Sequence, residues 1–269
     1  MTVSAASLSS ISTLSTLSSA HFDGVIAAGI AFARVAPVVY LLPILNGNVM
    51  SGVLRTAVAM WIAVGVWPYA YGAPLDLTTP VWTLVIREGS VGLLLGCALA
   101  WPFWVFHGLG AYIDNQRGAT LSSVIDPANG VDTSELANFF QWFGAVIYLH
   151  LGGMTLLLEV MAKSYRVCEP FGPCTLSVDR VHALLDSIVS HAISLSAPVV
   201  GALLLSELML GLLSRFAPQV NAFALSLTIK SLIAFAVLLI YFSAALPDAL
   251  NGLTTRPHDV VRWLSPVGG

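Results

Sequence analysis

Six long apolar segments, separated by shorter polar connections, follow one another along the chain. They lie at residues 24–45, 53–71, 82–109, 136–161, 181–215 and 222–247. Each is near the roughly 20 residues that an α-helix needs to cross the core of a bilayer. The pattern predicts an all-α fold: a polytopic membrane protein of about six long, partly kinked hydrophobic helices arranged as helical hairpins.

Two of these segments are too long for one straight span, and each contains a proline, Pro102 or Pro198. Because proline removes a helical hydrogen bond, we expect a kink or a break at both positions. No repeat or compositional break divides the chain, so we expect one helical domain over 23–247. A flexible Ser/Thr-rich N-terminal tail at 1–22 and a C-terminal tail at 248–269 would flank it.

The composition supports a membrane environment. Hydrophobic residues make up 57% of the 269 residues, charged residues only 9%, and the mean hydropathy is +0.85. A soluble domain has about 25% charged residues, so lipid or other protein must cover much of this surface. The net charge of −3 is small and scattered, which excludes a basic nucleic-acid-binding surface.

Charged residues inside apolar segments are costly and normally face protein, water or a partner charge. Glu207 lies eleven residues before Pro218 and Lys230 lies twelve after it, so a hairpin that turns at Pro218 would place both at one depth. We predict that they pair, either to neutralise buried charge or to serve transport. Arg215 ends its segment, as a helix cap or as a subunit contact.

Cys168 and Cys174 flank a short polar loop and form a candidate disulfide if that loop faces an oxidising compartment. The count of Lys and Arg on alternate sides, three against five, weakly favours a cytoplasmic C-terminus. The same count places the cysteine loop in the cytoplasm, where thiols stay reduced, so both interpretations remain open.

The motifs of common catalytic sites are missing from the sequence. There is no HExxH, no GxSxG elbow, no P-loop lysine motif and no Cys/His set with metal-ligand spacing. We therefore expect a non-enzymatic protein without a metal or a cofactor.

Two stretches go beyond a generic membrane protein. The first is Gly110-Ala-Tyr-Ile-Asp-Asn-Gln-Arg-Gly-Ala-Thr120, and the second runs from Ser206-Glu207 through Arg215-Phe-Ala-Pro-Gln-Val-Asn221 to Ile229-Lys-Ser231. Both resemble the FliR/SpaR/SctT family of export-apparatus membrane proteins in type III secretion systems. The resemblance extends from Arg34 to Tyr241, and the first stretch is more similar to injectisome members than to flagellar ones.

The resemblance implies a subunit of an export gate in the bacterial inner (cytoplasmic) membrane, where it is multi-pass. Its partners would be sister export-gate membrane subunits, the export switch membrane protein, lipid and the unfolded secreted proteins that pass along the axis. Packing on a sister subunit is implied for Glu207, Arg215, Pro218, Gln219, Asn221 and Lys230.

The family resemblance also implies a channel plug in the polar connection at 110–132. Its candidate residues are Tyr112, Ile113, Asp114, Asn115, Gln116, Arg117 and Gly118. Asp114 and Arg117, three residues apart, would fix this loop through an ion pair, and we predict that deleting 112–122 makes the resting membrane leaky to ions. An ordinary salt-bridged loop at the membrane surface is the alternative.

A stand-alone small-molecule or ion transporter is the alternative function for the whole chain. Such transporters usually show internal repeats with matching broken helices. The sequence shows no convincing repeat, which favours the gate subunit.

Overall fold

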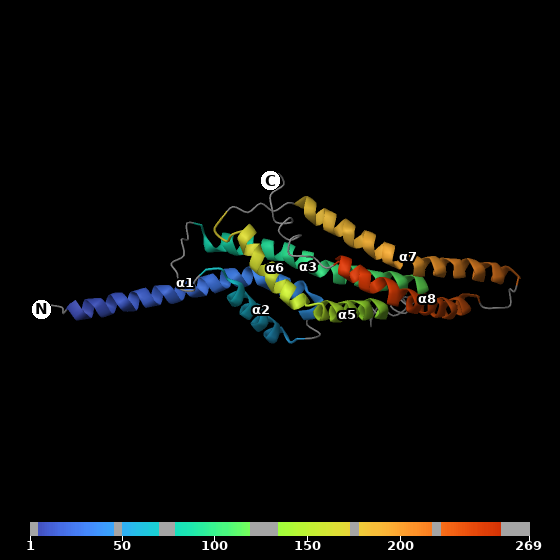
Figure 1. Ribbon diagram of the computed structural model, residues 1–269, viewed down its shortest axis with the longest axis horizontal. Helices are drawn as coiled ribbons and strands as arrows, with labels where there is room; N and C mark the ends of the chain where they lie inside the picture. The colour runs from blue at the N-terminus through green and yellow to red at the C-terminus, as the bar shows by residue number, and fades with distance from the viewer. Residues whose placement is uncertain are drawn as a thin grey trace. The chain divides into compact units, whose positions relative to one another are not determined.

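The computed structural model describes residues 5–45, 50–69, 79–118, 134–172, 178–216 and 222–253. This part of the chain is helical, without a strand, and Figure 1 labels its α-helices. The elements are α1 (Ala5–Leu41), the 3-10 turn η1 (Pro43–Leu45), α2 (Gly52–Val66), α3 (Val81–Arg117), α5 (Glu135–His150), α6 (Gly153–Val167), α7 (Val178–Phe216) and α8 (Ala222–Leu253). The prediction of an all-α, polytopic membrane protein is confirmed.

Fewer helices have the dimensions of a membrane span than the hydropathy pattern suggests. Within the described residues, three stretches are long and apolar enough: His21–Leu41, Val81–Arg117 and Asp186–Phe216. A fourth exists if α5 and α6 form one bent span. Helix α2 has only 15 residues, short of the roughly 20 that a bilayer core needs.

The single helix expected over 136–161 is two helices. Helix α5 ends at His150, α6 begins at Gly153, and the pair is bent by 77°. Gly152 lies at the bend with φ +82°, a left-handed backbone conformation that glycine adopts without the steric cost of a Cβ. The next glycine also matters, because a Cβ on Gly153 would lie 2.1 Å from the Tyr148 ring.

The prolines do not end their helices. Helix α3 continues through Pro102 and α7 continues through Pro198, so neither proline breaks its helix. The expected kink at each position stays a prediction. Helix α1 likewise contains Pro37. Apolar helices tolerate proline where neighbouring groups satisfy the freed backbone carbonyls.

The described residues group into two compact units, which we describe separately. The first unit comprises the described residues within 1–99 and 154–178, and the second comprises those within 100–153 and 179–253. The segment expected as an N-terminal tail is helical from Ala5 onwards, and α8 ends at Leu253 rather than near 247. The flexibility of both tails and the extent of the 23–247 domain stay predictions.

Close packing of α1 on α3 organises the first unit. A Cβ on Gly92 would lie 2.1 Å from the carbonyl oxygen of Arg34, and one on Gly96 would lie 3.1 Å from the Cα of Val38. The absent side chains therefore let the two backbones approach closely, as small residues do between membrane helices.

Four helices share the core of the second unit. Its buried side chains come from α3, α5, α7 and α8: Val105, Phe106, Leu109, Ile113, Leu136, Phe140, Ala192, Val199, Leu203, Ala234 and Leu238. Gly110 brings α3 against the start of α5, because a Cβ there would lie 2.4 Å from the backbone nitrogen of Ala137.

Candidate functional site

The candidate plug residues Tyr112 to Arg117 form the last turns of α3 instead of a loop. Ile113 continues the apolar face of this helix into the core and is fully buried. Gly118 follows with φ +79°, the left-handed geometry typical of the residue after a helix end. The polar connection therefore begins at Gly118, and its residues 119–133 lie outside the described residues.

These helical turns have two distinct faces. Ile113 and Asp114 are buried, whereas Tyr112 and Asn115 are exposed. Gln116 and Arg117 are half-buried between them.

Asp114 is the polar centre of this region. Its side chain is fully buried, and its Oδ1 accepts a hydrogen bond from Arg117 Nε at 2.7 Å. Its Oδ2 accepts hydrogen bonds from Ser134 Oγ at 2.9 Å and from the backbone nitrogen of Leu136 at 3.0 Å. The carboxylate therefore accepts three hydrogen bonds, one of them at the positive, N-terminal end of α5, and these bonds stabilise its charge.

Ser134 connects this carboxylate to the next helix. It is the N-cap residue of α5, and its side chain accepts a hydrogen bond from the backbone nitrogen of Ala137 at 3.4 Å. The end of α3 and the start of α5 are therefore tied together at Asp114. The sequence predicted the Asp114–Arg117 pair. It did not predict the contact with Ser134, although a serine directly before an apolar run is typical of a helix N-cap.

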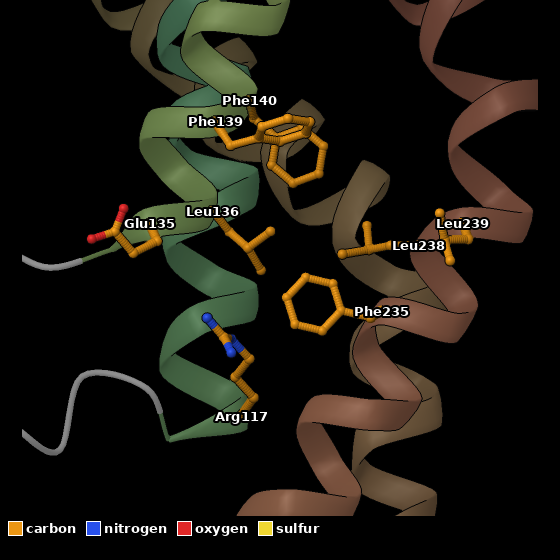
Figure 2. A pocket seen from close by; sticks show the side chains of 8 residues that line it. All are labelled: Arg117, Glu135, Leu136, Phe139, Phe140, Phe235, Leu238 and Leu239. Carbon is orange, nitrogen blue, oxygen red and sulfur yellow. The ribbon is translucent and has the colours of Figure 1, made fainter.

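A pocket of about 480 Å³ opens beside Arg117 (Figure 2). Its walls come from the end of α3, the first turns of α5 and the middle of α8: Arg117, Glu135, Leu136, Phe139, Phe140, Phe235, Leu238 and Leu239. The Arg117 guanidinium lies 5.4 Å from the centroid of the Phe235 ring, within cation–π range. Sequence reasoning did not identify this pocket, because no local pattern links α8 to α3.

The structure brings Glu207 of α7 and Lys230 of α8 together. Lys230 Nζ lies 3.0 Å from Glu207 Oε1, with the lysine side chain 12% exposed and the glutamate side chain 59% exposed. Arg215 is exposed in the last turn of α7. Pro218, Gln219 and Asn221 lie outside the described residues, so their packing role stays a prediction.

A second buried charge cluster lies in the first unit. Arg34 of α1 and Glu88 of α3 are both fully buried, and Arg34 Nε lies 2.5 Å from Glu88 Oε2. Arg34 also donates to Ser164 Oγ at 3.3 Å and to the carbonyl oxygen of Cys168 at 2.7 Å. Its guanidinium lies 4.0 Å from the Tyr165 ring centroid. This cluster joins α1, α3 and α6.

Arg87 holds the turn that follows α6. It donates to the carbonyl oxygen of Gly172 at 2.7 Å and to that of Glu169. Cys168 begins this turn, is buried and is disulfide-bonded. Cys174 lies outside the described residues, so the pairing of these two cysteines stays a prediction.

Comparison with known proteins points to bacterial protein export. A profile of the family described as bacterial export proteins, family 1, matches residues 25–255. The surface presentation of antigens protein SpaR of Salmonella typhimurium is 51% identical over 240 residues, which cover 89% of this chain and 91% of that protein.

Two further relatives show how the similarity falls off. The Yop proteins translocation protein T of Yersinia pestis is 33% identical over 84% of this chain and 89% of its own length. The flagellar biosynthetic protein FliR of Bacillus subtilis is 25% identical over 89% of this chain and 95% of its own length. The chain is therefore more similar to these secretion proteins than to the flagellar one.

Proposed function

Since the chain belongs to the bacterial export proteins, family 1, as an injectisome-type member of the FliR/SpaR group, we propose that it forms part of the channel wall of a type III export gate. We propose further that the connection after α3 carries the plug that occludes the closed channel. The subunit would act by shape and packing, without catalysis.

The single observation that supports the plug is the anchor at Asp114. A plug must stay in the channel when the gate is closed, so the loop that carries it needs fixed ends. Asp114 holds Arg117 at one end of the connection and Ser134 and Leu136 at the other. Described residues on both sides of 119–133 are thus attached to one buried carboxylate.

Exposed apolar surface supports assembly with other membrane proteins. In Asp186–Phe216 of α7, the most apolar window is only 22% buried, and lipid or sister export-gate subunits would cover the rest. We propose a multi-pass subunit of the bacterial inner membrane that contacts those sister subunits and the export switch membrane protein. Unfolded secreted proteins would pass beside it.

The test must leave the anchor in place. Deleting 112–122 would remove Asp114 and Arg117 themselves, and so would disturb the α3–α5 junction as well as the plug. The sharper variant replaces residues 119–133 by a shorter Gly/Ser linker that retains Gly118 and Ser134. The matched control replaces residues 70–78, a connection of the first unit, in the same way.

Ion conductance is then measured in resting cells that express the assembled export apparatus. The 119–133 variant should leak ions and the 70–78 variant should not. If the 119–133 variant assembles and stays as tight as the control, the plug assignment is wrong. Substrate uptake by the isolated chain in vesicles would instead support the stand-alone transporter.

A further inference from the structure

We propose that Cys168 belongs to an oxidative modification site, a disulfide with Cys174 that is introduced in the periplasm. Helix α6 and the turn that follows it then lie in this aqueous compartment. This placement rests on the inner-membrane location proposed above and not on the plug. It concerns residues of the first unit, and Cys174 itself lies outside the described residues.

The state of the cysteines is the first observation. Cys168 is disulfide-bonded, and Cys97 is a free thiol. The sequence contains three cysteines, so within one chain Cys174 is left as the partner of Cys168. Disulfides form and persist in oxidising compartments, whereas cytosolic thiols are kept reduced. The bond therefore indicates that the turn after α6 faces the periplasm.

The surface of α6 is a second, independent observation. Glu159 and Arg166 are exposed, and Lys163 Nζ lies 2.6 Å from Glu159 Oε1. Leu158, at 40%, is the only exposed large hydrophobic residue of this fully described helix. By contrast, the exposed residues of α7 between 204 and 213 are all apolar apart from Glu207. Because charges cost free energy in hydrocarbon, the outer face of α6 suits water and not lipid.

The length of α6 agrees with this placement. Its 15 residues rise only about 22 Å, less than the roughly 30 Å of a bilayer core. The count of Lys and Arg on alternate sides, three against five, does not oppose it. That count assumes six alternating crossings, whereas the described helices include three candidate spans, or four with the bent pair.

The turn after α6 is part of the buried charge cluster. The carbonyl oxygen of Cys168 accepts a hydrogen bond from Arg34 at 2.7 Å, and those of Glu169 and Gly172 accept from Arg87. A ring closed between residues 168 and 174 contains all three carbonyls and limits their freedom in the unfolded chain. Because Cys168 is fully buried, the oxidation must take place before this part of the chain completes its folding.

The chemistry is a thiol–disulfide exchange with a periplasmic dithiol-oxidising protein. The thiolate of one cysteine attacks the disulfide of that protein, and the second cysteine then attacks the mixed disulfide. One S–S bond forms in this chain and one breaks in the oxidising protein. That protein leaves as a dithiol, with the two electrons and two protons that the cysteines lose.

The disulfide is tested in cells that express the full chain with its sister subunits, in a Cys97→Ala background. Thiols are trapped with acid soon after synthesis, and the denatured chain is alkylated with a maleimide large enough to shift its band on a gel. The chain should show no shift without reductant and a double shift after reduction. In cells that lack the periplasmic dithiol-oxidising protein, the double shift should appear without reductant. The matched control Cys168→Ala should give a single shift in every condition.

The compartment is tested with Ala162→Cys, at an exposed position of α6, in the same background. Leu93→Cys is the matched control, because Leu93 is 51% exposed but belongs to the candidate span Val81–Arg117. A membrane-impermeant sulfonated maleimide is added to cells with a permeabilised outer membrane. Ala162→Cys should react while the inner membrane is intact. Leu93→Cys should react several-fold more slowly, because an apolar environment disfavours the thiolate.

Three results would overturn the proposal. The first is two free thiols in normal cells, and the second is a disulfide that forms equally fast without the periplasmic dithiol-oxidising protein. The third is an Ala162→Cys thiol that reacts only after the inner membrane is broken, or not at all. Fractionation of the same cells shows separately whether the chain is in the inner membrane with its sister subunits, so failure of the proposed function is distinguishable from these results.

Discussion

The backbones of α1 and α3 approach closely at Gly92 in the first unit, and Gly92→Ala should destabilise the protein. The Cβ of the alanine would lie 2.1 Å from the carbonyl oxygen of Arg34 and 2.8 Å from its carbonyl carbon. Both are backbone atoms, so no side chain can rotate away. The helices must separate by about 1.3 Å or more, the difference between 2.1 Å and the 3.4 Å at which ordinary contact begins.

This separation also affects the buried ion pair. Glu88 lies one turn before Gly92, and its bond to Arg34 Nε measures 2.5 Å, so a shift of that size would lengthen the bond beyond hydrogen-bond distance. Overpacking costs about 1–3 kcal/mol, and a hydrogen bond to a charged group contributes about 1.5–3 kcal/mol. Replacing glycine by alanine in a helix gains about 0.5–1 kcal/mol. Together these terms predict a net loss of about 1.5–5.5 kcal/mol in the free energy of unfolding.

Gly89→Ala is the matched control on the same helix. The nearest atom to its added Cβ is the carbonyl oxygen of Ala33 at 3.8 Å, an ordinary contact, so this variant should be as stable as the parent or slightly more stable. Unfolding of the full chain in one detergent, followed by circular dichroism and by size-exclusion elution, measures both variants. Stabilities within about 0.5 kcal/mol of each other would refute the reasoning.

Three further predictions use the same unfolding measurement. Glu88→Gln should lower the free energy of unfolding by about 3–5 kcal/mol, because it leaves the buried Arg34 without its counter-charge. Substituting both residues by apolar ones should recover part of that loss. A loss below about 1 kcal/mol for Glu88→Gln would contradict this prediction. Gly152→Ala should cost about 1–2 kcal/mol through the left-handed backbone alone, since nothing lies within 4 Å of the added Cβ, and Gly152→Asn should cost less. Glu207→Gln should change the stability of the isolated chain by less than about 1 kcal/mol because its carboxylate is 59% exposed; a larger loss would show that the pair is structurally essential.

Hydropathy located the helices better than it located their ends. Within the described residues, each of the six apolar segments contains an α-helix, yet Gly152 breaks one of them and Pro102 and Pro198 break none. The difference is physical: proline removes one donor, which the surroundings can accommodate, whereas a glycine at positive φ redirects the chain itself. Composition alone does not reveal which glycine adopts that conformation.

Local spacing predicted some contacts of the candidate site and missed others. The three-residue separation of Asp114 and Arg117 on one helix predicted their ion pair. The nearly equal distances of Glu207 and Lys230 from the turn at Pro218 predicted their contact. The bond between Asp114 and Ser134 joins the two sides of the polar connection after α3, whose sequence has no hydrophobic periodicity that would predict this contact.

The sequence by itself determined the helical class, the membrane character and the family of this protein, because hydropathy and long motifs are properties of consecutive residues. Only the tertiary structure decided that Arg34 pairs with Glu88, that Asp114 ties α3 to α5, and that α8 closes an apolar pocket beside Arg117. A buried charge must have a partner, but its chemistry does not specify which distant helix supplies it. That choice depends on how the helices pack in three dimensions.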